Sequence, residues 1–189
     1  MANEKLNILR LMIESREKEL SIRQISRIRK INYKSAYLNV KVLEQEGAIT
    51  VKRQGNISLC SFSGNFGECV FLAEYRRREE LLKDANFKVL YSRFSKINSQ
   101  FILLLFGSYA RKTFTKHSDI DLLLIADNPE DLRNEIKLLP LNIHLTHVAY
   151  KDFEAMLKTR EQTVVSEAIR KNIILFGIED YYRLMANAE

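Results

Sequence analysis

The chain has 189 residues, of which 46% are hydrophobic and 29% charged, and its formal net charge is +6. This composition can build ordinary hydrophobic cores, so we expect a folded, soluble protein with one large domain or two small ones. No apolar run approaches the roughly 20 residues that a membrane helix needs, and the first residues show no secretory pattern. We therefore expect a cytoplasmic protein with no membrane partner. Cys60 and Cys69 lack metal-ligand spacing, which favours reduced thiols over a disulfide or a zinc site.

The positive charge is concentrated in the first third of the chain. Residues 1–62 contain 12 of the 30 Lys and Arg residues but only 6 of the 24 Asp and Glu residues. The remainder is therefore balanced in charge. This asymmetry is typical of a nucleic-acid-binding module joined to a neutral domain, although a lysine-rich surface alone would give the same count.

Two helices are expected at the start of the chain. Apolar residues recur with helical spacing and predict a first helix over residues 4–18. These residues are Leu6, Leu9, Ile13 and Leu20. Ser21 has the chemistry of an N-cap, so a second helix is expected to begin directly after it. Its inward-facing residues are expected to be Ile22, Ile25 and Ile28.

A third helix and a hairpin follow. Asn32 is the expected cap of the third helix, which Gly47 ends. The buried line of this helix is expected to be Ala36, Val40 and Leu43. Residues 48–53 and 57–62 alternate in polarity around the turn residues 54–56, which predicts two antiparallel strands.

Together, residues 20–62 resemble a winged helix-turn-helix, and residues 43–49 are the most similar segment. The resemblance implies that the third helix and the hairpin, or wing, bind DNA. The side chains expected to contact DNA are Lys34, Ser35, Tyr37, Lys41, Lys52 and Arg53. Two alternatives stay open: the module could contact protein instead of DNA, and each of these side chains could simply be solvated. Such modules also often form homodimers.

Ser63 to Gly67 contains two glycines within five residues and is the expected linker. We therefore predict a winged helix-turn-helix domain over residues 1–62, a linker and connecting helix over 63–85, and a second domain over 86–189. The connecting helix carries three consecutive arginines, which favour an exposed, salt-bridged face over a binding site. A further helix over residues 87–97 is expected to bring Val89, Leu90 and Phe94 to a core.

The centre of the chain reads as strand, tight turn, strand. The apolar run over residues 101–106 ends at Gly107 and Ser108, where glycine lets the backbone approach a ligand and a hydroxyl stands beside free amides. Asp119 and Asp121 begin the second strand, and their spacing places both carboxylates on one face. Because two adjacent carboxylates repel each other, a cation between them is expected.

The remaining elements complete a second core. We expect a helix over residues 130–138, helices over 152–160 and 164–170, a short strand at 173–176 and a last short helix. The strand over residues 141–150 is expected to pair beside the strand that carries the two aspartates. Its polar face consists of Asn142, His144 and Thr146.

The segments 107–111 and 118–122, with their spacing and flanking apolar strands, resemble the signature of the nucleotidyltransferase superfamily that includes DNA polymerase beta. They are most similar to its minimal nucleotidyltransferases, over about residues 86–177. The resemblance implies an α/β (α+β) nucleotidyltransferase fold with a mixed sheet. It also implies transfer of a nucleoside monophosphate from a nucleoside triphosphate, most simply ATP, to a hydroxyl group. The acceptor of such small transferases is in some cases a partner protein.

The same resemblance assigns roles to individual residues. Gly107 and Ser108 would hold the terminal phosphates, and Asp119 and Asp121 would bind Mg²⁺, a hard cation that prefers oxygen ligands. The other nucleotide-binding candidates, each of which is also an ordinary loop residue, are Arg111, Lys112 and Ser118.

Two residues depart from the family pattern. Lys112 stands where relatives commonly have glycine, and His144 stands where a third acid is usual. Histidine can act as a general base but is a poorer Mg²⁺ ligand than a carboxylate. His144 is therefore a catalytic residue, part of a site that binds nucleotide without transferring it, or an ordinary polar strand residue.

Overall fold

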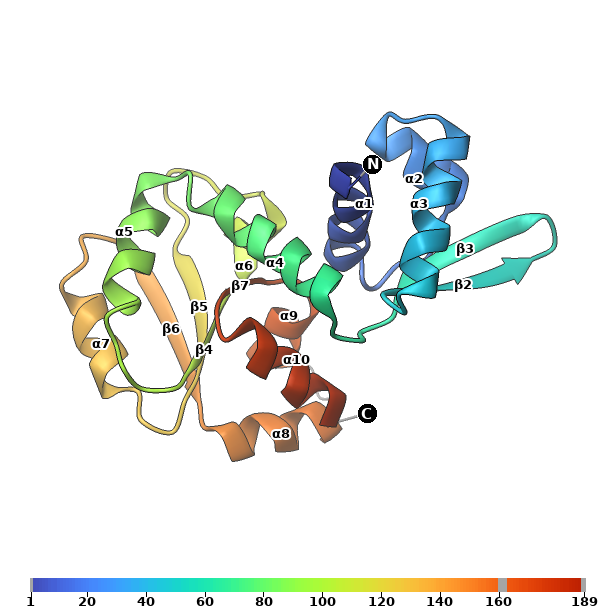
Figure 1. Cartoon of the computed structure of the whole chain (residues 1–189). Helices are drawn as coiled ribbons and strands as arrows, with labels where there is room; N and C mark the ends of the chain where they lie inside the picture. Colours follow the sequence, from blue (N-terminus) through green and yellow to red (C-terminus); the bar gives the residue numbers. More distant parts are fainter. Residues whose placement is uncertain (1, 160–162, 188–189) are drawn as a thin grey trace. The chain divides into compact units, whose positions relative to one another are not determined.

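The computed structural model describes residues 2–159 and 163–187 (Figure 1). The chain divides into two compact units, residues 1–75 and 76–189, and each unit is considered by itself. The division falls within one helix, α4 (Glu68–Leu81). Across the described residues, no helix is both long enough and apolar enough to cross a membrane. Cys60 and Cys69 are both free thiols.

The first unit begins with three helices. They are α1 (Ala2–Glu14), α2 (Ile22–Arg29) and α3 (Tyr33–Gln45). The predicted cap at Ser21 is confirmed: its hydroxyl accepts from the Gln24 amide, and the Gln24 side chain accepts from the Ser21 amide at 2.8 Å. The predicted cap at Asn32 is also confirmed, because its side chain accepts from the Ser35 amide.

Two predictions for these helices are wrong. The first helix ends at Glu14 rather than near residue 18, and Leu20 lies in a short strand instead of on its face. Ile28 was expected to point inward, but 52% of its surface is exposed. Residues spaced by three drift about 60° around an α-helix at each step. Ile28 has therefore rotated away from the buried face that Ile22 and Ile25 share.

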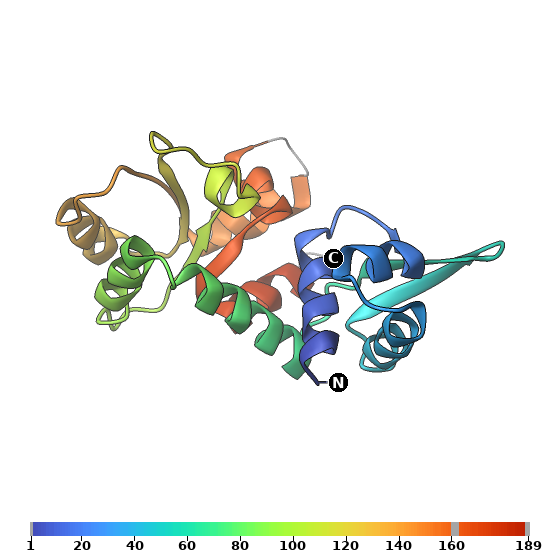
Figure 2. The same ribbon diagram turned by 90° about the horizontal axis from the view of Figure 1, so that it is seen from above.

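A three-stranded antiparallel sheet completes this unit, with the order β1-β3-β2. Its strands are β1 (Leu20–Ser21), β2 (Ile49–Gln54) and β3 (Ile57–Phe62). The predicted hairpin is confirmed, with Gln54 paired to Ile57 and a turn of two residues that places Gly55 at a φ of +59°. The hairpin extends well beyond the three helices (Figure 2).

The predicted arginine-rich face of α4 is wrong for two of its three members. Arg77 is only 4% exposed, and its guanidinium donates to the backbone carbonyl of Asn172. Arg78 donates to the carbonyl of Leu175 at 3.1 Å, and its guanidinium lies 5.2 Å from the centre of the Tyr91 ring. Both guanidinium groups therefore donate to backbone carbonyls at or near β7.

The second unit contains a mixed four-stranded sheet, as predicted, with the order β6-β5-β4-β7. Its strands are β4 (Ile102–Leu105), β5 (Ile120–Ile125), β6 (Ile143–Val148) and β7 (Ile173–Phe176). Strand β5 runs antiparallel to β4 and parallel to β6, so the predicted neighbour of the aspartate strand is confirmed. The central strands β4 and β5 are apolar except for Asp121, as expected for strands whose two faces are covered by helices.

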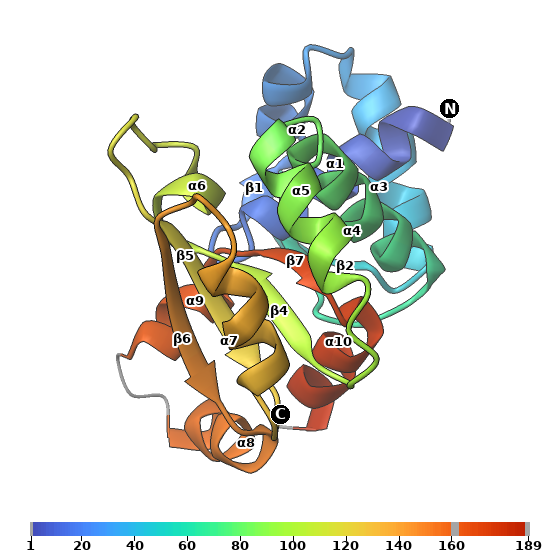
Figure 3. The ribbon, with the colours of Figure 1, turned by 90° about the vertical axis from the view of Figure 1, so that its left-hand side faces the viewer.

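Helices α5 and α7 lie on one face of this sheet, and α8, α9 and α10 lie on the other (Figures 1 and 3). Their bounds are α5 (Ala85–Phe94), α7 (Glu130–Lys137), α8 (Tyr150–Thr159), α9 (Val164–Arg170) and α10 (Ile178–Asn187). Val89 was expected in the core but is 49% exposed, because Phe87, Leu90 and Phe94 occupy the inward face of α5. The expected end of α8 at Arg160 lies outside the described residues.

Candidate functional site

The predicted glycine-serine turn lies where β4 ends. The chain turns at Gly107, whose φ is +66°, and enters a short helix, α6 (Gly107–Arg111), that the sequence pattern did not predict. The amide of Phe106 donates to the carbonyl of Asp121 at 3.0 Å, which fixes the turn against β5. The first amides of a helix have no acceptor within it, and Phe106 offers no side-chain cap. These amides are suited to an anion such as a phosphate.

Gly107 lies directly against one of the two predicted aspartates. A Cβ atom added to Gly107 would come 2.0 Å from Oδ2 of Asp121 and 2.8 Å from its Cγ. No side chain fits between this turn and the carboxylate. The structure therefore brings the predicted phosphate-binding turn and the predicted metal-binding strand into direct contact.

Two pairs of polar side chains cross from β5 to β6. The parallel register places Asp121 opposite His144, and Nδ1 of His144 lies 3.5 Å from Oδ1 of Asp121. One step earlier, the side-chain amide of Asn142 donates to Oδ1 of Asp119, and its backbone carbonyl accepts from the Ile120 amide at 2.9 Å. We call Asp119, Asp121, Asn142 and His144 the polar quartet. Its four members lie on one face because side chains alternate along each strand.

The polar quartet is accessible from solvent but contains only two acids. The His144 side chain is 65% exposed, and that of Asp121 is 27% exposed. In the parts of the chain that the structure describes, no group of three or more His, Cys, Asp or Glu side chains could hold a metal ion. Any cation held by Asp119 and Asp121 would therefore need further ligands from a substrate or from water.

The other predicted nucleotide-binding residues are engaged in local structure. Arg111 forms an ion pair with Glu167 of α9, and both side chains are about half exposed. The hydroxyl of Ser118 accepts from the Thr115 amide at 2.9 Å and closes a turn in the loop between α6 and β5. The structure thus gives these two residues local partners, and their nucleotide-binding roles stay predictions.

Lys112, which stands where relatives commonly have glycine, adopts a backbone conformation that glycine favours. Its φ of +60° lies in the left-handed region, where residues other than glycine are uncommon. Its amide donates to the carbonyl of Tyr109 at 3.1 Å, and the Thr113 amide donates to that of Ser108 at 2.9 Å. The residue that follows α6 therefore adopts a backbone conformation that favours glycine.

The side chains predicted to contact DNA lie on α3 and on β2. Lys34 and Tyr37 are exposed on α3, while Lys52 and Arg53 are exposed on the hairpin. Lys41 is paired with Glu44 at 2.7 Å, and this hydrogen bond and charge raise the pKa of the Lys41 ammonium group. The Ser35 amide is occupied by the Asn32 cap, and Lys52 lies 3.8 Å from Glu19.

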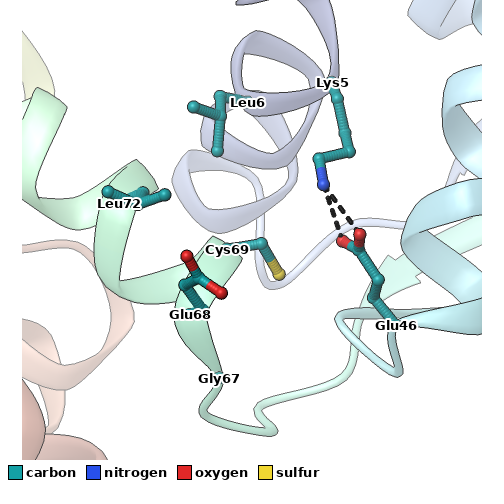
Figure 4. A pocket seen from close by; sticks show the side chains of 7 residues that line it. All are labelled: Lys5, Leu6, Glu46, Gly67, Glu68, Cys69 and Leu72. Atoms are coloured by element: carbon teal, nitrogen blue, oxygen red, sulfur yellow. Dashed lines mark hydrogen bonds and ion pairs between the residues drawn. The ribbon is translucent and has the colours of Figure 1, made fainter. Parts of the chain in front are cut away.

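Two pockets in the first unit were not predicted. A groove of about 450 Å³ beside α3 includes Lys34 and Ser35 together with Leu38 and Val42, which are 51% and 40% exposed. A second pocket of about 410 Å³ is lined by α1 and the start of α4 (Figure 4). At its edge, Lys5 forms an ion pair with Glu46 at 2.7 Å. None of the predicted site residues lines this second pocket.

Sequence reasoning also missed two contacts in the second unit. It named Asn142 only as a neighbour of His144 and predicted that the two strands pair, but it gave no register that would place Asn142 beside Asp119. It gave Tyr109 and Phe114 no role, yet their rings stack with centres 4.5 Å apart. Tyr109 lies in α6 and Phe114 in the loop that follows it, so no helical or strand periodicity links the two residues.

Comparison with known families bears on this second unit. Residues 90–177 match the nucleotidyltransferase domain family. The match confirms the predicted resemblance to a nucleotidyltransferase domain over residues 90–177, a segment that contains the Gly107 turn and the whole polar quartet. The match covers just under half of the chain and does not reach the first unit. No curated protein and no solved structure matched the chain.

Proposed function

We propose that the protein is a Mg²⁺-dependent nucleotidyltransferase that moves a nucleoside monophosphate from a nucleoside triphosphate to a hydroxyl acceptor. The single observation that carries this proposal is the direct contact between the Gly107 turn and Asp121, inside a domain that matches the nucleotidyltransferase family. One side of this contact offers backbone amides to phosphate oxygens. The other side offers carboxylates to a cation, so together they can hold a metal-bound triphosphate.

The donor set fits Mg²⁺. Sites for this ion commonly consist of one or two carboxylates completed by substrate phosphates and water, and Asp119 and Asp121 provide two carboxylates on one face. When bound there, the ion would neutralise negative charge on the triphosphate. Asn142 donates to Asp119 and His144 lies beside Asp121, so each carboxylate has a neighbour that fixes its orientation.

The residues of the proposed site account for the leaving group and the proton of the proposed reaction. The oxygen of the acceptor hydroxyl forms a bond to the α-phosphorus, and the bond from that phosphorus to the β-phosphate oxygen breaks and releases pyrophosphate. The amides at Gly107 and Ser108 hold the departing phosphates. Nδ1 of His144 faces Asp121, which leaves Nε2 of this exposed ring for the proton of the attacking hydroxyl.

The test of this proposal uses labelled ATP, Mg²⁺ and a cell extract as the source of acceptors, including protein acceptors. We expect the wild type to transfer label and to release pyrophosphate, and Asp119→Asn and Asp121→Asn to lose both activities. Asp131→Asn is the matched control, because Asp131 is an exposed acid on α7, away from the polar quartet. Equal labelling by all four proteins would overturn the assignment of the aspartates.

A second candidate function is nucleotide binding without transfer, in a protein that regulates transcription. The observation that favours it is that the polar quartet contains two acids, with His144 at the position where a third acid is usual. In this case the wild type binds ATP and Mg²⁺ in calorimetry and labels no acceptor. Its affinity for DNA then differs between the free and the nucleotide-bound protein.

We further propose that the first unit is a winged helix-turn-helix that binds DNA. The proposal is supported by the capped helices α2 and α3, by the long β2–β3 hairpin and by the excess of basic residues. The protein-contact alternative is supported by the exposed Leu38 and Val42 in the groove beside α3. An affinity for DNA that falls steeply with salt concentration would favour the DNA-binding proposal over the protein-contact alternative.

A further inference from the structure

Phe114 is a large apolar side chain that the fold leaves in solvent. It lies in the loop between α6 and β5, and 53% of its surface is exposed. Figure 3 shows this loop projecting beyond the end of the sheet, next to α6. Single exposed apolar residues are common and need no explanation by themselves. The surroundings of Phe114 set it apart.

The Phe114 ring rests on a rigid support. It is stacked on the Tyr109 ring, with centres 4.5 Å apart and planes inclined by only 8°. Tyr109 in turn meets the edge of Phe87 at 5.4 Å, and Phe87 is a buried member of the core between α5 and the sheet. One face of Phe114 is therefore held by a parallel ring that is anchored in the core. The ring is fixed as a flat surface at low entropic cost.

The loop that carries Phe114 is tied to the proposed phosphate-binding turn. The amide of Thr113, the residue before Phe114, donates to the carbonyl of Ser108 at 2.9 Å. Tyr109, which supports the ring, directly follows Ser108. The same loop exposes three groups that carry or can carry positive charge, namely Lys112, Lys116 and His117. An aromatic plane among such groups is the combination that binds bases and their phosphates.

We propose that Phe114 is a stacking platform for a nucleobase. This inference rests on the proposed function and adds to it a residue that recognises the base. The base belongs either to the donor nucleotide or to a nucleic-acid strand that enters as acceptor, and the stacking chemistry is the same for both. Every base has a flat π face, so the contact favours nucleotides over base-free phosphates without selecting one base.

The first test compares MgATP with inorganic tripolyphosphate, which carries the same charged chain without a base. Stacking contributes about 1–3 kcal/mol per base, so Phe114→Ala is expected to weaken MgATP binding roughly 5- to 150-fold. Tripolyphosphate binding should stay unchanged. Phe114→Leu keeps an apolar side chain without a ring and should resemble Phe114→Ala, whereas Phe114→Tyr should resemble the wild type.

A second measurement does not depend on affinity. The chain contains no Trp, so Phe114→Trp introduces a single indole reporter. A base stacked on that indole should quench its fluorescence, whereas saturating tripolyphosphate should leave it unchanged. Thermal denaturation of each variant confirms that it is folded.

Oligonucleotides identify the source of the base. If the base belongs to a strand, Phe114→Ala weakens binding of a single-stranded oligonucleotide, and leaves MgATP and an abasic oligonucleotide of equal length unaffected. If all Phe114 variants bind every probe as the wild type does, the stacking role is overturned and the proposed transferase stands. If the wild type binds neither MgATP nor tripolyphosphate nor an oligonucleotide, the proposed function itself fails.

Discussion

The side-chain amide of Asn142 donates a hydrogen bond to Asp119 across two parallel strands. The backbone of Asn142 is held at the same place, because its carbonyl accepts from the Ile120 amide. One oxygen of Asp119 is therefore engaged by a fixed donor, and the other would face the cation in the proposed site. Such partners of metal ligands orient the ligand and raise the affinity of the site.

Asn142→Ala is expected to weaken Mg²⁺ binding roughly 10- to 100-fold, because Asp119 loses the donor that orients it. Binding of Mn²⁺, followed by electron paramagnetic resonance, measures the loss directly. Asn86→Ala serves as control, since Asn86 is an exposed residue on α5. A merely structural Asn142 would lower the melting temperature by the same amount with and without Mg²⁺, and the metal affinity would not change.

Gly107→Ala is expected to destabilise the protein and to abolish nucleotide binding. The added methyl group would overlap the Asp121 carboxylate, and the φ of +66° is unfavourable for any residue with a Cβ. Gly55→Ala is the matched control, because Gly55 has a φ of +59° but open space around its Cβ position. Left-handed backbone costs roughly 1–2 kcal/mol at both sites. In urea denaturation, Gly107→Ala should exceed this cost, and equal losses would contradict the clash.

Lys112→Gly is expected to stabilise the second unit by about 1 kcal/mol, because glycine adopts the left-handed conformation at position 112 without the Cβ penalty. Lys112→Ala separates this conformational effect from the loss of the lysine side chain, since alanine keeps the Cβ atom. The free energy of unfolding from urea titration should rank glycine above alanine. Alanine at or above glycine would show that the turn is not strained.

Lys52→Ala and Arg53→Ala are expected to weaken DNA binding if the hairpin contacts phosphates. Each lost phosphate contact should reduce the slope of log K against log salt concentration by about 1. Fluorescence anisotropy over a series of salt concentrations gives this slope. Lys137→Ala, on α7 of the second unit, is the control and should leave the slope unchanged. Unchanged slopes for both hairpin variants would favour a protein partner for this unit.

Local chemistry made much of this fold predictable. Ser21 and Asn32 could be predicted as helix caps because each side chain offers an acceptor to the unpaired amides of the helix that follows it. The neighbouring position of β5 and β6 also follows from sequence, since a short helix between two strands places them side by side, whereas the register that pairs Asp121 with His144 does not.

Features that depend on distant partners could not be predicted. Arg77 is buried because it reaches the carbonyl of Asn172, and nothing near Arg77 in the sequence indicates such an acceptor. Arg111 lies in the predicted phosphate-binding segment, yet its partner is Glu167 of a later helix. In both cases tertiary packing supplies the partner that local sequence leaves open.

The strand order predicts different mobility for the two strands that carry Asp121 and His144. Strand β5, which carries Asp121, is flanked by β4 and β6 and is buried along most of its length. Strand β6, which carries His144, is mostly half-buried and lies at the edge of the sheet, where it pairs with β5 alone among the described strands. Edge strands open at lower free energy than central strands, so amides of β6 should exchange with solvent faster than those of β5. The strand that carries Asp121 is therefore expected to be more rigid than the strand that carries His144.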